Sequence, residues 1–179
     1  MRVTLVRHCE VEEDYLGCYN GHNDIGLSQK GYAQAKELAE KLKNETYDAV
    51  FCSDLKRAKE SLKYFTNLQN IVFTDKLREK SWGEDEGKTY DEICKEKNIE
   101  YENFEQWIAA LGGESVSEFT KRMNEFFFQH LPNIGTKNVL VVTHSGVIKT
   151  LFSIYEGIGL EEAFSRKIDY AMTYYININ

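Results

Sequence analysis

Three short apolar segments, each running directly into polar or basic residues, constrain the fold of this chain more than any other feature. They cover residues 3–6, 49–52 and 139–142 of the 179-residue sequence. Segments of this length, bounded by turn signals, are typical of strands buried on both faces of a parallel sheet. Segments of helical period alternate with them, which predicts an α/β fold with a mainly parallel central sheet.

Each of the three segments precedes a predicted helix. The first helix begins near Ser28, the second is predicted to be capped by Asp54, and the third follows residues 143–146. Apolar residues recur at helical spacing in all three. These residues are Tyr32, Ala35, Ala39 and Leu42 in the first, Leu55, Ala58, Leu62 and Phe65 in the second, and Val147, Leu151 and Ile154 in the third.

Capping boxes mark further helix starts in the middle of the chain. Thr89 pairs with Glu92 and Ser115 with Glu118, so this region is predicted to be mostly helical. Residues 168–178 are interpreted as a terminal strand. The sequence shows no repeat or proline-rich linker, since Pro132 is the only proline. We therefore predict one domain, residues 1–179, folded as a three-layer sandwich whose central sheet is flanked by helices.

Composition limits the partners and the compartment. Hydrophobic residues make up 42% of the chain, enough for a substantial core, and the net charge of −7 opposes binding to nucleic acid. Charges interrupt every apolar stretch, so no membrane span is predicted. The four cysteines form no C-x-x-C pair and no leader precedes residue 3. We expect a cytoplasmic protein, and a homodimer stays open.

Four basic side chains are predicted to gather at the carboxyl edge of the sheet, where ligands of open parallel sheets bind. Arg7 and His8 follow the first strand, Arg57 lies in the first turn after the second, and His144 follows the third. Arginine forks match the oxygens of a phosphate, and imidazoles supply a nucleophile and a donor near neutral pH. This set predicts phosphoryl transfer.

An ordered series of short motifs resembles the histidine phosphatase superfamily across most of the chain. The motifs are R-H-C-E at 7–10, G-H-N-D-I-G-L-S at 21–28, C-S-D-L-K-R-A at 52–58, L-R-E at 77–79, W-G at 82–83, E-G at 86–87, G-E-S at 113–115 and T-H-S-G at 143–146. Each motif alone is weak evidence. Their shared order makes the resemblance specific.

The resemblance implies a role for each matching residue. His8 would attack phosphorus and become phosphorylated, with Arg7, Arg57 and His144 holding the phosphoryl oxygens. Glu79 would protonate the leaving oxygen, a task for a carboxylic acid with a pKa raised by burial. The remaining substrate-binding candidates are Asn20, Gly21 and Ser145. No cofactor and no metal are predicted.

Two positions depart from the family pattern. Cys9 replaces the usual glycine after the nucleophile, and Asp14 stands where a polar amide is common. A carboxylate pointing inward would repel phosphate, so we expect Asp14 to face solvent and Asn20 to supply the missing donor.

Two rival mechanisms fit the sequence less well. The acidic residues Glu10, Glu12, Glu13 and Asp14 do not copy the spacing of a known calcium loop and are interpreted as solvated. A cysteine phosphatase needs a C-x5-R loop, whereas four residues separate Cys52 from Arg57.

Three functions remain after these exclusions. The first is hydrolysis of a small phosphomonoester, and the resemblance is nearest to the α-ribazole phosphatases of cobalamin biosynthesis. The alternatives are a phosphoglycerate mutase, whose members generally carry longer insertions, and a weakly active binding module. The carboxylates after His8 are predicted to disfavour substrates with a second acidic group. Tyr15, Tyr19 and Trp82 are expected to offer a flat surface to an aromatic base.

Overall fold

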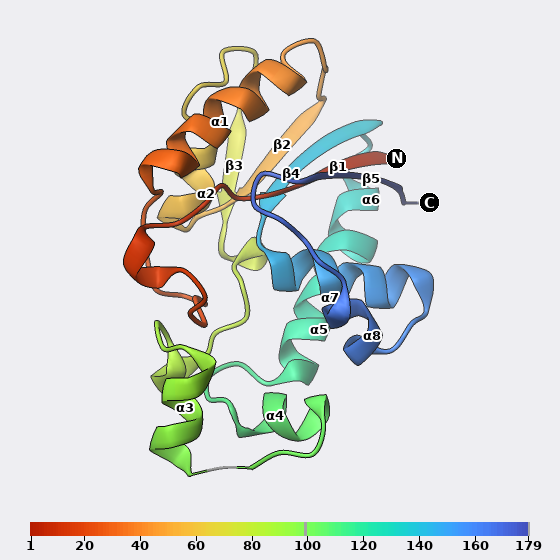
Figure 1. Ribbon diagram of the computed structural model, residues 1–179. Helices are drawn as coiled ribbons and strands as arrows, with labels where there is room; N and C mark the ends of the chain where they lie inside the picture. The colour runs from red at the N-terminus through yellow and green to blue at the C-terminus, as the bar shows by residue number, and fades with distance from the viewer. Residues whose placement is uncertain (99, 179) are drawn as a thin grey trace.

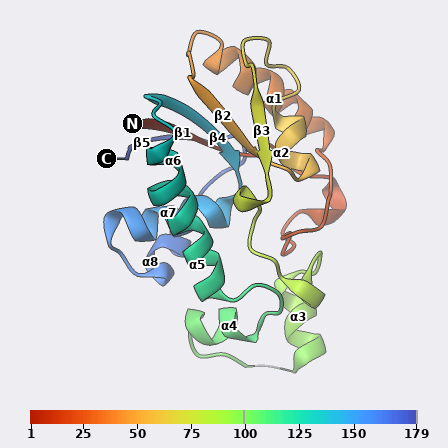
Figure 2. The ribbon, with the colours of Figure 1, turned by 180° about the vertical axis from the view of Figure 1, so that it is seen from behind.

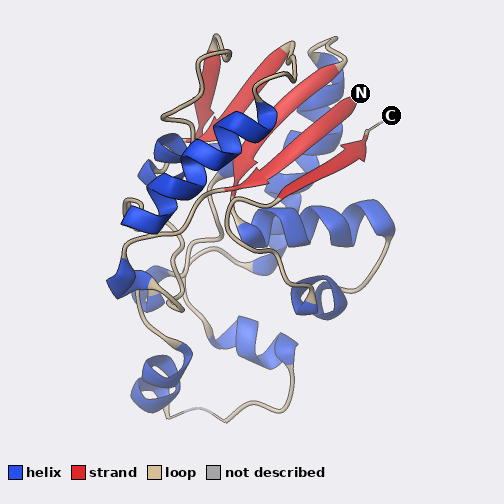
Figure 3. Ribbon diagram, turned by 45° about the horizontal axis from the view of Figure 1, so that its top comes forward, coloured by secondary structure: helices blue, strands red, loops and turns tan. Residues whose placement is uncertain are grey.

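A five-stranded sheet forms the centre of the protein, as a computed structural model describing residues 1–98 and 100–178 shows. The strand order is β3-β2-β4-β1-β5 (Figure 1). Four strands are parallel, and β5 runs antiparallel beside β1 at one edge (Figure 3). The strands are β1 (Arg2–Arg7), β2 (Ala49–Ser53), β3 (Ile71–Thr74), β4 (Asn138–Thr143) and β5 (Thr173–Asn177).

Successive side chains of the inner strands pack into two different cores, because side chains alternate across a sheet. In β4, Val139 and Val141 belong to one apolar cluster, whereas Leu140 and Val142 belong to the other. All four are fully buried. This burial on both faces is why the strands read as continuous apolar runs in the sequence.

Helices cover both faces of the sheet, so the predicted three-layer α/β sandwich is confirmed. The helices α1 (Gln29–Leu42) and α2 (Lys56–Ser61) pack on one face. The other face is covered by α5 (Val116–Asn124), a π-helical segment (Glu125–His130), α6 (Leu131–Asn133) and α7 (Ser145–Glu156), as Figure 2 shows from behind. The short helix α8 (Leu160–Ser165) packs against α7.

The capping segment, residues 75–98 and 100–115, lies beyond the carboxyl edge of the sheet (Figure 1). It contains 3₁₀ turns at Asp75–Leu77 and Gly83–Asp85 and the helices α3 (Tyr90–Lys97) and α4 (Phe104–Ala110). A further 3₁₀ turn, Glu13–Tyr15, lies outside this segment, in the loop after β1.

The capping segment has its own apolar cluster. Its buried members are Trp82, Ile93, Trp107, Ile108 and Leu111.

The predicted helix starts are confirmed at the three positions where a side chain caps the helix. Ser28 caps α1 by accepting a hydrogen bond from the Gly31 N–H, and the capping boxes at Thr89 and Ser115 are both formed. Because these caps are local interactions, sequence spacing alone locates them.

Three other predictions about elements were wrong. Leu55, not Asp54, occupies the N-cap of α2, because both Asp54 carboxylate oxygens accept from the Arg78 guanidinium at 2.6–2.7 Å. The helix ends at Ser61, so Phe65 lies outside it. The terminal strand covers only Thr173–Asn177. In addition, the sequence analysis missed the edge strand β3, whose Val72 and Phe73 are exposed in the structure.

Within the part of the chain that the structure describes, no helix combines the length and the apolar character needed to span a bilayer.

Truncating a central-strand leucine should destabilise this fold far more than truncating an exposed one. Leu140 is fully buried in β4, whereas Leu16 is 41% exposed. We expect Leu140→Ala to lower the free energy of unfolding by about 2–5 kcal/mol through lost burial and a cavity. Leu16→Ala should change it by no more than about 0.5 kcal/mol. Chemical denaturation of both variants measures this, and equal losses would contradict the layer assignment.

Candidate active site

The pairing of β1 with β4 brings the carboxyl ends of these two strands together. Arg7 lies opposite Thr143 in the parallel register, and the backbone N–H of His8 donates to the Thr143 carbonyl at 2.8 Å. The next residue of β4's corner is His144. The ring centroids of His8 and His144 are therefore only 5.0 Å apart.

One nitrogen of His8 is bonded to the backbone and the other is left for chemistry. Its Nδ1 lies 2.8 Å from the Cys9 carbonyl oxygen, which can only accept. The proton of the neutral ring therefore sits on Nδ1, and Nε2 carries a lone pair. Burial, with Arg57 and Arg7 nearby, holds the pKa of His8 well below its usual value. At neutral pH the ring is an uncharged potential nucleophile.

His144 is almost completely buried and is held by Ser53 at the end of β2. Its Nε2 lies 2.8 Å from the Ser53 hydroxyl oxygen. When that hydroxyl donates its hydrogen to Nε2, the neutral ring carries its proton on Nδ1. Burial and the neighbouring Arg57 and His8 hold the pKa of His144 well below its usual value.

The Arg57 side chain is fully buried at the start of α2. Its two terminal nitrogens donate to backbone carbonyls of the loop after β1: Nη1 to Asn23 at 2.8 Å, and Nη2 to Gly21 at 2.7 Å and Asn20 at 3.2 Å. Burial lowers the pKa of Arg57 to about 10, so it remains a cation at neutral pH.

Arg7 approaches the site from the end of β1. Its Nη1 donates to the Ile168 carbonyl, and its guanidinium stacks on the Tyr170 ring at 3.8 Å from the centroid. Burial lowers the pKa of Arg7, while Tyr170 and Glu79 oppose the shift. The stacked ring fixes the plane of the guanidinium without using its Nε.

Three buried nitrogens around His8 have no hydrogen-bond partner among the described residues. They are Arg7 Nε, Arg57 Nε and His144 Nδ1. A buried donor without an acceptor is costly, and native proteins rarely leave several together. An anion with several oxygens, such as a phosphoryl group, has the acceptors that such donors lack.

Glu79 reaches the same place from the loop after the Asp75–Leu77 turn. Its two carboxylate oxygens accept from backbone N–H groups: Oε1 from Lys80 at 2.9 Å and Oε2 from Gly146 at 2.8 Å. The Glu79 side chain is buried. A Cβ at position 146 would lie only 2.9 Å from the Glu79 carboxyl carbon. Glycine at 146 therefore permits the close approach of Glu79 to the start of α7.

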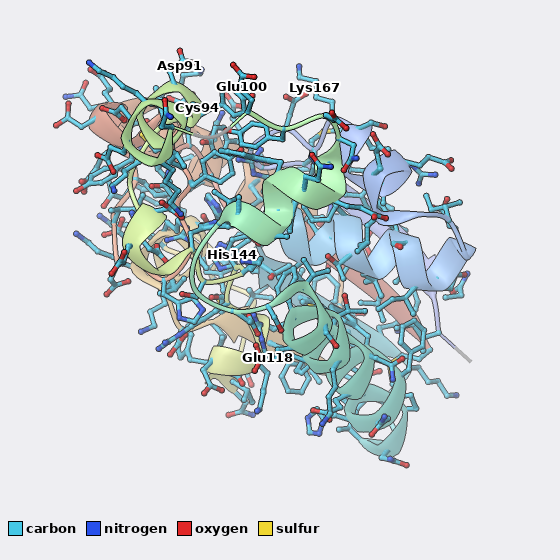
Figure 4. All side chains as sticks on the ribbon, turned by 90° about the horizontal axis from the view of Figure 1, so that it is seen from below. Asp91, Cys94, Glu100, Glu118, His144 and Lys167 are labelled. Atoms are coloured by element: carbon cyan, nitrogen blue, oxygen red, sulfur yellow. The ribbon has the colours of Figure 1, made fainter. Side chains whose placement is uncertain are left out.

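A cavity of about 350 Å³ opens onto this constellation. Of the predicted site residues, Arg7, His8, Asn20, Glu79 and Ser145 line it. Arg57 and His144 do not line it, because both are buried around His8 instead. Figure 4 shows His144 near the middle of the molecule seen from below, whereas Asp91, Glu100 and Lys167 lie at the periphery.

The loop after β1 differs from expectation in its details. Asp14 is exposed, as expected. The Asn20 amide is bonded within its own loop, donating to the Tyr15 carbonyl and accepting from Asn23. Gly21 does not line the cavity, and its N–H donates to Glu86. Gly21 therefore contributes to the conformation of the loop and not to the lining of the cavity.

The far wall of the cavity is mainly aromatic, and sequence reasoning missed most of its residues. Tyr19 and Trp82 line it as expected, but Tyr15 does not. Side chains from α4, α7, α8 and the segment before β5 complete the wall. They are Phe104, Trp107, Ile108, Lys149, Phe164 and Tyr170. Their only sequence signal is the aromatic content of two segments far apart in the chain.

The acidic residues after His8 turn away from the cavity. Glu10 bonds Lys30 at 2.7 Å and Ser28 at 3.0 Å, and Glu12 accepts from the Gly26 N–H. Among the described residues, no three acidic, histidine or cysteine side chains cluster as a metal site would require. The expectation that these carboxylates repel a second acidic group is therefore unsupported, since none lines the cavity.

The cysteines near the site are not competing nucleophiles. Burial raises the pKa of the Cys9 thiol to about 11 and also raises the pKa values of Cys52 and of Cys18, which lines the cavity, so all three stay protonated at neutral pH. A thiol without its thiolate is a weak nucleophile.

Residues 3–179 match the model of the histidine phosphatase superfamily, branch 1. The chain belongs to this superfamily. It is 30% identical to the adenosylcobalamin/α-ribazole phosphatase of Salmonella typhimurium over 158 residues, covering 86% of this chain and 78% of that protein. It is 28% identical to a putative phosphoserine phosphatase of Hydrogenobacter thermophilus, covering 95% of this chain and 86% of that one.

A solved structure extends the likeness to the whole fold. The α-ribazole phosphatase of Shigella flexneri superposes with a TM-score of 0.86 at 27% identity, covering 100% of this chain and 91% of that chain. Family and relatives together make this chain a phosphatase that acts on small phosphate substrates through a phosphohistidine.

The two paired histidines should stay neutral well into the acidic range. Burial and the cations Arg57 and Arg7 disfavour the protonated rings, so His8 and His144 should titrate below about 6.5, the value of an unperturbed histidine. NMR titration of the ring nitrogens measures this, with the urea-unfolded chain as the reference. A midpoint at or above the unfolded value for either ring would contradict the described burial.

Proposed function

We propose that His8 is the nucleophile, that Arg7, Arg57 and His144 hold the transferred phosphoryl group, and that Glu79 transfers the proton. The observation that carries this proposal is the set of three partnerless buried nitrogens around a histidine whose Nδ1 is bonded to a carbonyl. The lone pair on Nε2 and the donors for the phosphoryl oxygens then belong to one site.

The reaction would take two displacements. In the first, the Nε2 lone pair of His8 forms a bond to phosphorus, the ester P–O bond breaks, and Glu79 gives its proton to the leaving oxygen. In the second, Glu79 takes a proton from water as the water oxygen attacks phosphorus. The N–P bond breaks, its electron pair returns to His8, and inorganic phosphate leaves. Atoms and charge balance over the cycle.

The fixed donors would lower both barriers in the same way. Charge on the equatorial oxygens is spread during phosphoryl transfer, and preorganised cations stabilise it without rearranging. Arg7 is held by Tyr170 and Ile168, and Arg57 by three carbonyls, so both guanidiniums are fixed in place by the protein.

The leaving-group side of the cavity supports a substrate with a flat, largely apolar portion. The tilted rings of Phe104 and Phe164 pack with their centroids 5.3 Å apart, and Trp107 donates to the Tyr19 hydroxyl at 2.7 Å, which holds the aromatic wall in place. Two relatives named above are α-ribazole phosphatases. We propose α-ribazole 5′-phosphate, a sugar phosphate with an aromatic base, as the substrate, because aromatic faces suit such a base.

The cellular setting is also a proposal. All four cysteines are free thiols, which fits a reducing compartment, and we propose that the protein works in the cytoplasm.

Removing the proposed nucleophile should abolish turnover without unfolding the protein. We expect His8→Ala to lower kcat by on the order of 10³-fold or more, because the covalent route is lost. His130→Ala, a change of an exposed histidine in the π-helical segment, should leave kcat within about 2-fold. Phosphate release and circular dichroism measure both properties. Near-normal activity of a folded His8→Ala protein would overturn the mechanism.

The aromatic wall predicts an order of substrates. We expect kcat/KM for α-ribazole 5′-phosphate to exceed that for 3-phosphoglycerate by on the order of 10-fold or more, since only the former can use the wall. Phosphate release from each ester, and phosphoglycerate isomerisation with bisphosphoglycerate present, are the measurements. Phosphoryl return to phosphoglycerate faster than release to water would favour the mutase alternative.

A further inference from the structure

Two consecutive peptide units lie between the carboxylate of Glu86 and the guanidinium of Arg57. In the unit joining residues 20 and 21, the carbonyl accepts from Arg57 Nη2 at 3.2 Å and the N–H donates to Glu86 at 2.9 Å. In the next unit, the Gly21 carbonyl accepts from Arg57 at 2.7 Å and the His22 N–H donates to Glu86 at 2.8 Å. Both peptide dipoles therefore point from one charge toward the other.

Glu86 makes further bonds of the same kind. Its carboxylate also accepts from the N–H groups of Asn23 at 3.0 Å and Trp82 at 3.0 Å, and from the Ser81 hydroxyl at 3.4 Å. It does not line the cavity. A carboxylate that accepts from four backbone N–H groups and a hydroxyl is committed to holding backbone in one conformation.

The shape of the loop is adapted to this carboxylate. A Cβ on Gly21 would lie 2.4 Å from the Lys80 carbonyl oxygen, 2.5 Å from Glu86 Oε1 and 2.8 Å from Trp82 Cδ1, closer than Cβ contacts in real structures. Only glycine at 21 lets the peptide sit between the two charged groups. The glycine and the carboxylate therefore serve the same arrangement.

The orientation of Arg57 depends on this loop. Its Nη1 and Nη2 are bonded to three carbonyls of residues 20–23. No carboxylate among the described residues is hydrogen-bonded to Arg57, although the charges of Glu79, Glu86 and Asp24 act on it through space. The carbonyls can face Arg57 only while the N–H groups on the other side of the same peptides face an acceptor. Glu86 is that acceptor.

We propose that Glu86 is a positioning residue, which acts through the backbone of residues 20–23 to hold the Arg57 guanidinium where it binds the transferred phosphoryl group. This inference rests on the proposed function of Arg57. Glu86 touches no reacting atom in this scheme. Without its carboxylate the loop loses the acceptor for its N–H groups, its carbonyls turn, and Arg57 no longer presents Nε to the phosphoryl oxygens.

A double-mutant cycle between residues 86 and 57 tests the proposal. Glu86→Gln keeps the size of the side chain but sets an NH₂ group against backbone donors. We expect it to lower kcat/KM, mainly through kcat, by on the order of 10- to 100-fold, as misplacement of a transition-state contact does. In an Arg57→Lys background, whose side chain lacks the fork, the same change should cost less than about 3-fold. Glu84→Gln, an exposed neighbour, is the matched control and should leave kcat/KM unchanged.

The outcomes separate this inference from the proposed function. If Arg57→Lys alone leaves kcat/KM unchanged, the phosphoryl-binding role of Arg57 is wrong. If Arg57→Lys lowers it but Glu86→Gln costs the same factor in both backgrounds, Glu86 is merely structural and the proposal is overturned. Should Glu86→Gln fail to fold, Gly21→Ala, which forces the loop away from the carboxylate, is compared in the same two backgrounds with the same expectations.

Discussion

The parallel pairing of β1 with β4 is the constraint on which the active site depends. Its register places Arg7 opposite Thr143, so the residues that follow, His8 and His144, leave the sheet side by side. A shift by one residue would send every buried side chain of these strands to the opposite face. The two apolar cores therefore lock the register, and the same burial that stabilises the sheet fixes the distance between the two imidazoles.

Burying two arginines around two histidines is electrostatically costly, and the structure offsets the cost in distinct ways. Arg57 gives its terminal nitrogens to carbonyls, and Arg7 stacks on Tyr170. The histidines avoid charge altogether, because burial and the nearby cations keep them neutral. What remains is a set of donors that have no acceptor among the described residues, and such a set favours the binding of an anion. In the proposed mechanism, the phosphoryl group supplies the acceptors.

Local patterns predicted the buried strands β1, β2 and β4, the capped helices and the strand ends that hold Arg7, His8 and His144, because buried strands and caps depend on residues close in the chain. Long-range contacts decided the rest. Asp54 stands where a helix cap is expected, but its carboxylate accepts hydrogen bonds from the Arg78 guanidinium instead. Phe104, Phe164 and Lys149 come from separate helices, and nothing in the spacing indicates that they face one cavity. Gly21 and Glu86 both stand in the family motifs, but only the fold shows that they meet.

Trapping the covalent intermediate tests the central claim most directly. Enzyme mixed rapidly with excess α-ribazole 5′-phosphate or p-nitrophenyl phosphate and quenched in base can be digested and mapped by mass spectrometry. The account predicts one phosphoryl group, labile in acid and stable in base, on the peptide that contains His8, formed no more slowly than the enzyme turns over. Steady turnover with no phosphoryl group on the protein, or with the group on another residue, would contradict it.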